Sequence, residues 1–243
     1  RGAALAGDTG LKRAAERTRS RELALIQRAD ATLVVSPVER GMLAEWLPDA
    51  RVEVVANLHE LAATGLPFEQ RHDLVFVGGF RHPPNVDAVR WFGSEVFPLI
   101  HARRPEIRFH CIGVAPPPEV QALQAQPGIV VHGHVAELGP YMDGARIALA
   151  PLRFGAGVKG KINLSMAHGQ PVVATSCAIE GMHLSSGHDV LVADDAAGFA
   201  DAVLRLYGDA ALWQRLSDHG RDNIARHFSL DAARDTVRRV FLR

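Results

Sequence analysis

Short apolar runs alternate with helix-like segments from residue 73 onward, and this alternation limits the fold more than any other feature of the sequence. The runs are continuous and rich in β-branched residues, as is typical of parallel strands that are buried on both faces. Strand–helix alternation at this spacing predicts an α/β domain with a doubly wound, Rossmann-like parallel sheet. The six predicted strands are Leu74–Val77, Arg108–Ile112, Ile129–Val131, Ile147–Ala150, Pro171–Ala174 and Val190–Val192.

Helix-like segments fill the intervals between these runs and follow the last one. The first should start at Asn85, whose side chain can cap a helix, and it should place Val89, Phe92, Val96 and Ile100 on one face. In such a sheet, ligands bind beyond the carboxyl ends of the strands, so function is expected in the loops that follow them. The remaining predicted helices are Pro118–Ala125, Glu137–Gly144, Gly160–His168, Ala196–Tyr207, Ala210–His227 and Leu230–Leu242.

The first quarter of the chain is organised differently. A polar helix over residues 11–29 leads into a strand at Thr32–Val35, and Ser36 and Pro37 favour the start of a second helix, before a strand at Val52–Val55. These elements hold too little apolar surface to close a domain alone. Because the chain starts on an arginine and shows no signal-peptide pattern, we expect it to be a fragment of a longer protein.

Composition disfavours several classes of partner. Lys+Arg and Asp+Glu both number 27, so the chain lacks the basic surplus of nucleic-acid binders, and no nucleic-acid partner is expected. No apolar run reaches the length of a transmembrane helix. Cys111 and Cys177 lie beside apolar runs and have no metal-binding spacing, which fits a reducing compartment and predicts a cytoplasmic location.

The strongest chemical signal is the glycine- and lysine-rich loop 154–161, between the fourth predicted strand and a helix. Its three glycines free backbone N–H groups, the helix N-terminus adds a partial positive charge, and its two lysines add full charges. This combination suits a phosphate or diphosphate, with a plain connector carrying solvated lysines as the alternative. The candidate ligands of the diphosphate in this loop are Gly155, Gly157, Val158, Lys159, Gly160 and Lys161.

Two other interpretations of glycine-rich loops fail on detail. The stretch from Gly155 to Lys161 matches the P-loop pattern G-x-x-x-x-G-K, but Ile162 follows where Mg²⁺ coordination needs a hydroxyl. The loop with Gly78 and Gly79 after the first strand is not G-x-G-x-x-G, so a dinucleotide site is unsupported. That loop suits either a close-approaching ligand or a plain turn.

Two further loops carry polar side chains. His132 and His134 flank a glycine after the third strand, but without a nearby carboxylate or cysteine we expect them to line a ligand cleft rather than bind a metal. Glu180, after the fifth strand, either faces the cleft or is an exposed loop carboxylate. No catalytic Ser–His–Asp or Cys–His arrangement stands out.

Taken in order, these segments resemble the C-terminal half of retaining glycosyltransferases of family 4, which have the GT-B fold. The resemblance extends from about residue 73 to the end of the chain, and its most specific piece is Met166–Thr175. It implies a nucleotide-sugar-binding domain over residues 69–227, a C-terminal helix over 228–243, and a remnant of the N-terminal acceptor-side domain with its linker over 1–68. The other segments that carry it are 76–79, 131–135, 150–152, 180–181, 194–195 and 228–229.

The resemblance implies transfer of a sugar from a UDP-, GDP- or dTDP-sugar to an acceptor hydroxyl, with retention, in polysaccharide or glycoconjugate synthesis. In this family backbone amides and cationic side chains, without a metal or other cofactor, stabilise the diphosphate, and the matching amides belong to residues 159–161. His134, Val135 and Leu164 would contact the nucleoside. The implied acceptor is a sugar, a lipid-linked glycan or another hydroxyl compound, with peripheral membrane association through the N-terminal domain.

Two departures from the family pattern bear on activity. The family's two glutamates, separated by seven residues, correspond here to Ala156 and Leu164, which offer no carboxylate. The basic pair of the first loop is also missing, so Arg81, together with the two lysines of loop 154–161, would supply the charge. Catalytic residues cannot be assigned, and the fragment should be inactive alone. The alternatives are a GT-B nucleotide-sugar epimerase and a non-catalytic binding or interaction domain.

Overall fold

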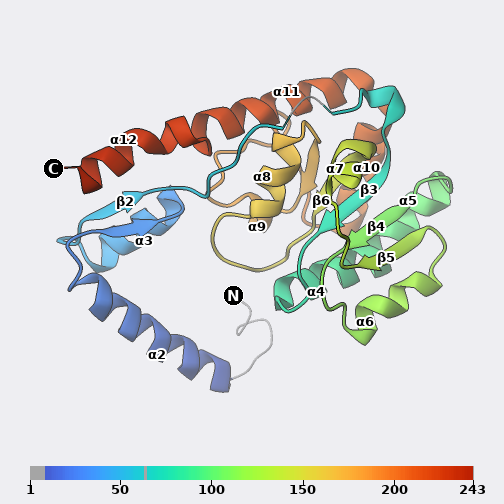
Figure 1. The fold of residues 1–243 in the computed structure, drawn as a ribbon. Coiled ribbons are helices and arrows are strands. Elements are labelled where there is room, and N and C mark those ends of the chain that lie inside the picture. Colours follow the sequence, from blue (N-terminus) through green and yellow to red (C-terminus); the bar gives the residue numbers. More distant parts are fainter. Residues whose placement is uncertain (1–8, 63–64, 243) are drawn as a thin grey trace.

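The structure, a computed structural model, describes residues 9–62 and 65–242, and its centre is a parallel six-stranded sheet. All six predicted strands are present, so the predicted α/β class is confirmed (Figure 1). The strands of this sheet are β3 (His72–Val77), β4 (Phe109–Ile112), β5 (Ile129–Gly133), β6 (Ala145–Ala150), β7 (Val172–Ala174) and β8 (Leu191–Val192).

The strand order of the sheet creates one point where the chain reverses direction. The order is β5-β4-β3-β6-β7-β8, so the chain starts in the middle, moves outward to β5 and returns to β6 beside β3. In open α/β sheets the crevice at such a reversal is where ligands bind. The loops that leave β3 and β6 therefore flank the expected site, and these are the two glycine-containing loops of the sequence analysis.

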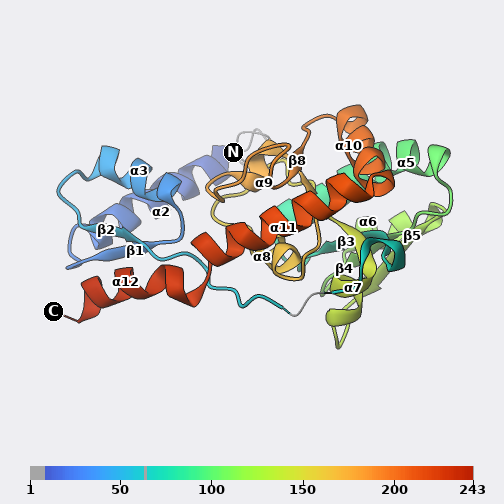
Figure 2. The same cartoon turned by 90° about the horizontal axis from the view of Figure 1, so that it is seen from above.

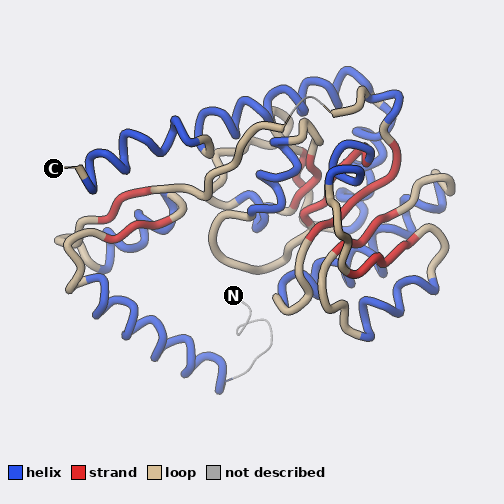
Figure 3. The backbone as a smooth tube through the Cα atoms, viewed as in Figure 1, coloured by secondary structure: helices blue, strands red, loops and turns tan. Residues whose placement is uncertain are grey.

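Helices cover both faces of this sheet, as Figure 3 shows. On one face Phe92 packs edge-on against Phe109 of β4, with ring centroids 4.7 Å apart, and against Phe199. On the other, α8 contacts β6 and β7 and packs against α11. The first face carries α4 (Pro83–Trp91), α5 (Phe97–Arg103) and α10 (Ala196–Gly208); the second carries α7 (Gly139–Gly144), α8 (Gly160–Ala167) and α11 (Ala210–His227). Across the described residues, no helix is long and apolar enough to cross a bilayer.

The predicted start of the first of these helices is wrong. The helix α4 begins at Pro83 with His82 at the N-cap, because proline lacks an N–H and suits the first helical positions. Asn85 therefore lies inside the first turn, and its side chain donates instead to the carbonyl oxygen of Gly79, at 2.8 Å. The predicted apolar face is confirmed, although a π-helical segment, Phe92–Val96, interrupts it; Val89, Phe92, Val96 and Ile100 are fully buried.

The first quarter forms a small separate sheet. The parallel pair β1 (Thr32–Val34) and β2 (Val52–Val54) joins α2 (Thr9–Ile26) and α3 (Pro37–Trp46). Ser36 caps α3 as predicted, its hydroxyl accepting from the N–H of Glu39 at 3.2 Å. No residue of α3 is buried, which confirms that these elements do not close a core of their own.

The C-terminal helices connect the two sheets. Figures 1 and 2 show α11 running over the large sheet and α12 (Leu230–Phe241) lying beside β2. The guanidinium of Arg239 on α12 contacts the Glu53 carboxylate of β2 at 2.8 Å. The connection is reinforced where the N–H of His59 donates to the carbonyl of Phe228 at 2.7 Å.

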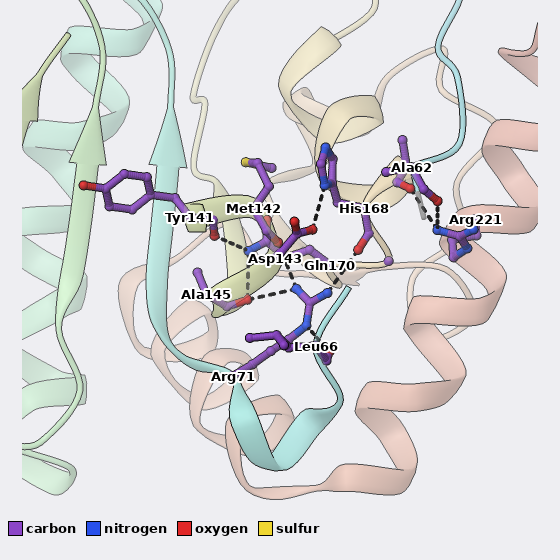
Figure 4. A network of polar contacts seen from close by, with 12 residues as sticks. Ala62, Leu66, Arg71, Tyr141, Met142, Asp143, Ala145, His168, Gln170 and Arg221 are labelled. Carbon is purple, nitrogen blue, oxygen red and sulfur yellow. Dashed lines mark hydrogen bonds and ion pairs between the residues drawn. The ribbon is translucent and has the colours of Figure 1, made fainter. Parts of the chain in front are cut away.

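A buried arginine fixes the start of β3 (Figure 4). Arg71 is 1% exposed and donates to four carbonyl oxygens, which belong to Leu66, Met142, Ala145 and His168. These carbonyls come from the linker, from α7 and β6, and from the end of α8, so one guanidinium joins segments far apart in the sequence. Five fixed N–H donors make arginine able to do this.

We predict that Arg71→Met will lower the free energy of unfolding by about 2–4 kcal/mol, because the carbonyl oxygens of Met142, His168 and Leu66 lose the donor that Arg71 provides. Urea unfolding followed by circular dichroism measures this difference. Arg205→Met, on an exposed position of α10, is the matched control and should change stability by less than about 0.5 kcal/mol. Equal effects of the two substitutions would contradict the structural role of Arg71.

Candidate functional site

The loops after β3 and β6 meet at the reversal point of the sheet through one lysine. Lys161, in the first turn of α8, donates through Nζ to Oδ1 of Asn85, in the first turn of α4. The distance is 2.5 Å, and the same asparagine also holds the carbonyl of Gly79. Lys161 belongs to the glycine- and lysine-rich loop 154–161, and Asn85 follows the loop that contains Gly78 and Gly79. The contact therefore brings these two predicted loops together.

Two glycines make room for this contact. A Cβ on Gly78 would lie 2.8 Å from Nζ of Lys161 and 2.9 Å from Nδ2 of Asn85, so a side chain there would displace both groups. A Cβ on Gly113, after β4, would lie only 2.0 Å from the carbonyl oxygen of Gly78. Gly78 is one of the predicted site residues and Gly113 is not, although its place directly after the second predicted strand is a signal in the sequence.

The amine of Lys161 is partly withdrawn from water and has no charged partner. Its Nζ lies 4.0 Å from the centroid of the Phe76 ring, and burial, with a smaller contribution from the charge of Lys159, lowers the pKa of Lys161 to about 7. Burial also raises the pKa of the neighbouring Cys111 to about 12, so that thiol is neutral and offers no counter-charge. Within the described ranges, no carboxylate forms an ion pair with Lys161. The position favours an anion that would restore the positive charge.

The loop before α8 presents backbone donors beside this amine. Gly155 and Gly157 have φ angles of +135° and +73°, which only glycine adopts without strain. Lys159 is the N-cap of α8 and provides no side-chain cap, and its Nζ donates to the carbonyl of Gly157. The N–H groups of Gly160 and Lys161 are at the open end of the helix, where they have no acceptor among the described residues. Amides of this kind suit an anion.

A ligand at this place would lie on an open rim rather than in a closed pocket. A cavity of about 10 Å³ between α8 and the sheet reaches Lys161 and Ser165, which is room for about one water molecule. The N-terminal end of α3 closes one side of the rim. A Cβ on Gly157 would lie 3.7 Å from Oε1 of Glu39, and one on Gly181 would lie 3.0 Å from Cβ of Ser36.

The other predicted site residues are spread along the same edge. Gly79 borders Val114, and Arg81 is exposed on the loop after β3. Val158 is half-buried against the core of the large domain. The predicted nucleoside contacts lie elsewhere on the edge: His134 is exposed after β5, Val135 packs against the core, and Leu164 is half-buried one turn into α8.

His132 is engaged in a hydrogen-bonded chain on the sheet. Its Nε2 lies 2.9 Å from Nδ1 of His110, and its Nδ1 lies 3.3 Å from the hydroxyl of Tyr141. His110 in turn contacts the carboxylate of Asp73 at 3.2 Å. Burial, and next to it the charge of His110, lower the pKa of His132. Both ring nitrogens of His132 thus have protein partners. Asp73 and His110 are on other strands, so no local pattern in the sequence predicts these contacts.

Comparison with known proteins identifies the family. The sequence profile of the family described as "Glycosyl transferases group 1" matches residues 71–209, which is more than half of the chain. A curated relative, described as an uncharacterized 44.6 kDa protein in the cps region of Klebsiella pneumoniae, is 27% identical over 140 residues. The match covers 54% of this chain and 36% of the relative, so the chain spans about a third of that protein.

Solved structures agree on the fold. TarM of S. aureus, in a complex with UDP, superposes with a TM-score of 0.79 at 12% identity, covering 93% of this chain and 46% of that one. The pneumococcal O-GlcNAc transferase GtfA, with UDP and GlcNAc, gives 0.70 at 14%, covering 90% and 46%. Sucrose-phosphate synthase from Thermosynechococcus elongatus gives 0.69 at 17%, covering 91% and 60%. The chain therefore belongs to the glycosyl transferases group 1 family and has the fold of about half of a GT-B glycosyltransferase.

Proposed function

We propose that this chain is the donor-binding part of a glycosyltransferase that uses a nucleoside diphosphate sugar. The observation that carries the proposal is the Lys161 amine at the reversal point of the sheet, which is desolvated and has no carboxylate partner in the described ranges. Beside it, the N–H groups of Gly160 and Lys161 have no acceptor among the described residues. A diphosphate would accept from those amides and would restore the charge of the lysine.

The chemistry of sugar transfer fits such a site. As the bond to the sugar breaks, negative charge accumulates on the leaving diphosphate, and donors fixed in advance stabilise it most effectively where water is scarce. In this proposal the amides of residues 159–161 and the ammonium of Lys161 bind the diphosphate, with Gly155 and Gly157 shaping the loop. Gly78, Gly79 and Arg81 border it from the β3 side, and His134, Val135 and Leu164 contact the nucleoside. No step requires a metal.

The named neighbours indicate which donor to test first. TarM, GtfA and the Anabaena protein HepE were each solved with UDP, the last also with glucose. A UDP-sugar is therefore the first candidate, before GDP- and dTDP-sugars. The relative in the cps region supports a place in polysaccharide or glycoconjugate synthesis, with a sugar, lipid-linked glycan or other hydroxyl compound as acceptor.

The chain covers only part of these proteins, so the role of each of its segments is also a proposal. Residues 69–227 would bind the donor, the helix over 228–243 would connect to the acceptor side, and residues 1–68 would belong to the acceptor-side domain and the linker. Catalytic groups would then come largely from outside this chain. The proposed cytoplasmic location rests on the cysteine argument of the sequence alone.

One observation favours a binding protein without catalysis. Ala156 is exposed in the glycine-rich loop and Leu164 is half-buried on α8, so the two positions where the family carries glutamates offer no acceptor to a sugar or ribose hydroxyl. A longer protein that binds UDP-sugars and never consumes them would establish this alternative. Release of sugar without any acceptor would instead favour an epimerase.

We predict that Lys161→Ala will weaken binding of UDP by about 10- to 150-fold, since one charge-assisted contact to a diphosphate contributes about 1.5–3 kcal/mol. Isothermal titration calorimetry with UDP, GDP and ADP measures the effect and orders the nucleotides. Lys12→Ala, at an exposed position of α2, is the control and should bind as the unmodified chain does. Binding that is equally strong without Lys161 would remove the basis of the proposal.

Binding should also take up a proton above neutral pH. The pKa of Lys161 is about 7 in the unliganded chain, and a bound diphosphate would raise it. The affinity for UDP should therefore be highest below pH 7, where Lys161 already carries its proton. It should fall by up to about tenfold per pH unit as the pH rises above 7. Calorimetry at pH 7.5 and 8.5, in buffers of different ionisation enthalpy, measures how many protons are taken up when UDP binds. Lys161→Ala should abolish this proton uptake. An affinity independent of pH over this range would contradict the assignment.

A further inference from the structure

Two histidines and an aspartate gather where the turn before β8 meets α11. One nitrogen or carboxylate oxygen of each of His188, Asp189 and His219 lies within 4.8 Å of those of the other two. His188 and Asp189 are in the turn 185–190, and His219 is in the middle of α11. This cluster uses none of the residues proposed to bind the diphosphate.

The aspartate is fixed by the turn around it. The backbone N–H groups of His188 and Asp189 both donate to the carbonyl of Ser185, at 3.1 Å. The Asp189 side chain is largely buried; its Oδ2 accepts from the N–H of Ser185 at 2.9 Å, and its Oδ1 faces Nδ1 of His188, also at 2.9 Å. The position and orientation of this carboxylate are therefore set before any ligand arrives.

One histidine is oriented in the manner of a metal ligand. Nδ1 of His219 lies 2.9 Å from the carbonyl oxygen of His188, so this nitrogen carries the proton and Nε2 keeps its lone pair. Metal-binding histidines usually donate their other ring N–H to a carbonyl or carboxylate, which fixes the tautomer. The rings of His188 and His219 stack at 4.1 Å and 22°.

We propose that His188, Asp189 and His219 bind a divalent transition-metal ion, for which Zn²⁺ is the best match, with water completing a tetrahedral shell. Two imidazoles and one carboxylate favour zinc and its neighbours over Mg²⁺ and Ca²⁺, which prefer oxygen ligands alone. Metal bonds of about 2.0–2.1 Å require ligand atoms about 3.3 Å apart, so the cluster must contract. The proposal assigns this movement to His188, because its side chain is 62% exposed and its ring can leave the stack to present Nε2 to the ion.

A bound ion would fasten the turn to a helix that already contacts the same segment. One turn further along α11, Nδ2 of Asn223 donates to the carbonyl of Met182 at 3.2 Å. One turn beyond that, His227 stacks on His183 at 4.1 Å. The segment 182–190 thus meets α11 at three successive turns, and the metal would strengthen the first of these contacts. An ion that binds only the folded chain raises its stability by mass action.

Calorimetric titration of the EDTA-treated, dialysed chain with Zn²⁺ tests the proposal. One ion per chain should bind, with a rise in Tm, and Co²⁺ at the same site should give the visible absorption of a tetrahedral complex. His219→Ala and Asp189→Asn should each weaken Zn²⁺ binding by roughly 10- to 100-fold or more. Circular dichroism without metal checks that the variants fold. If His219→Ala does not fold, His188→Ala takes its place in the binding test, because the His188 side chain is 62% exposed.

A matched control lies on the same helix. His227→Ala removes the second stacked histidine pair, which within the described ranges forms no such three-ligand cluster, and it should change the affinity for Zn²⁺ far less than His219→Ala does. His72→Ala, at an exposed position at the start of β3, controls for binding to surface histidines. Absence of Zn²⁺ binding to the unmodified chain would overturn the proposal. So would loss of binding in His227→Ala equal to that in His219→Ala, or His219→Ala binding as tightly as the unmodified chain.

Discussion

The contact between the Lys161 amine and the first turn of α4 is the interaction on which the account of this protein depends. It joins the loops after β3 and β6 at the one place where the strand order reverses. It exists because Gly78 has no side chain and because Gly113 lets the neighbouring loop come close. A cation placed between a phenyl ring and one amide oxygen is under-satisfied, since a lysine ammonium has three donors. The unused capacity points to a ligand.

The other end of the same strand shows the contrast. Arg71, directly before β3, is only 1% exposed, yet its guanidinium donates to four carbonyl oxygens. Arg146 strengthens that end further by donating to the carbonyls of Arg71, Phe68 and Tyr207. Strand β3 therefore has a satisfied cation at its amino end, which holds the fold, and an unsatisfied one at its carboxyl end. A buried charge that has all its partners stabilises a structure, whereas one that lacks them is expected where a ligand binds.

The sequence predicts the strands of the large sheet, but it does not predict the side-chain contacts of these two cations. Six continuous apolar runs predicted six strands correctly, because burial on both faces leaves a pattern in neighbouring residues. Asparagine is a common N-cap, which is why Asn85 predicts a helix start, but the two prolines before it start the helix earlier. The partners of Lys161, Arg71 and His219 lie far away along the chain, so no local pattern revealed them. The glycine-rich loop could be found because its residue types alone suit an anion; whether it binds one is still a prediction.

A crystal structure of the chain with bound UDP tests the central claim most directly. The account predicts diphosphate oxygens within about 3.2 Å of the backbone nitrogens of residues 159–161 and of Nζ of Lys161, which is hydrogen-bonding distance. The lysine would then have turned from Asn85 toward the phosphates. A diphosphate bound elsewhere on the sheet edge, with Lys161 still held by Asn85 and the amides of α8 unoccupied, would contradict it.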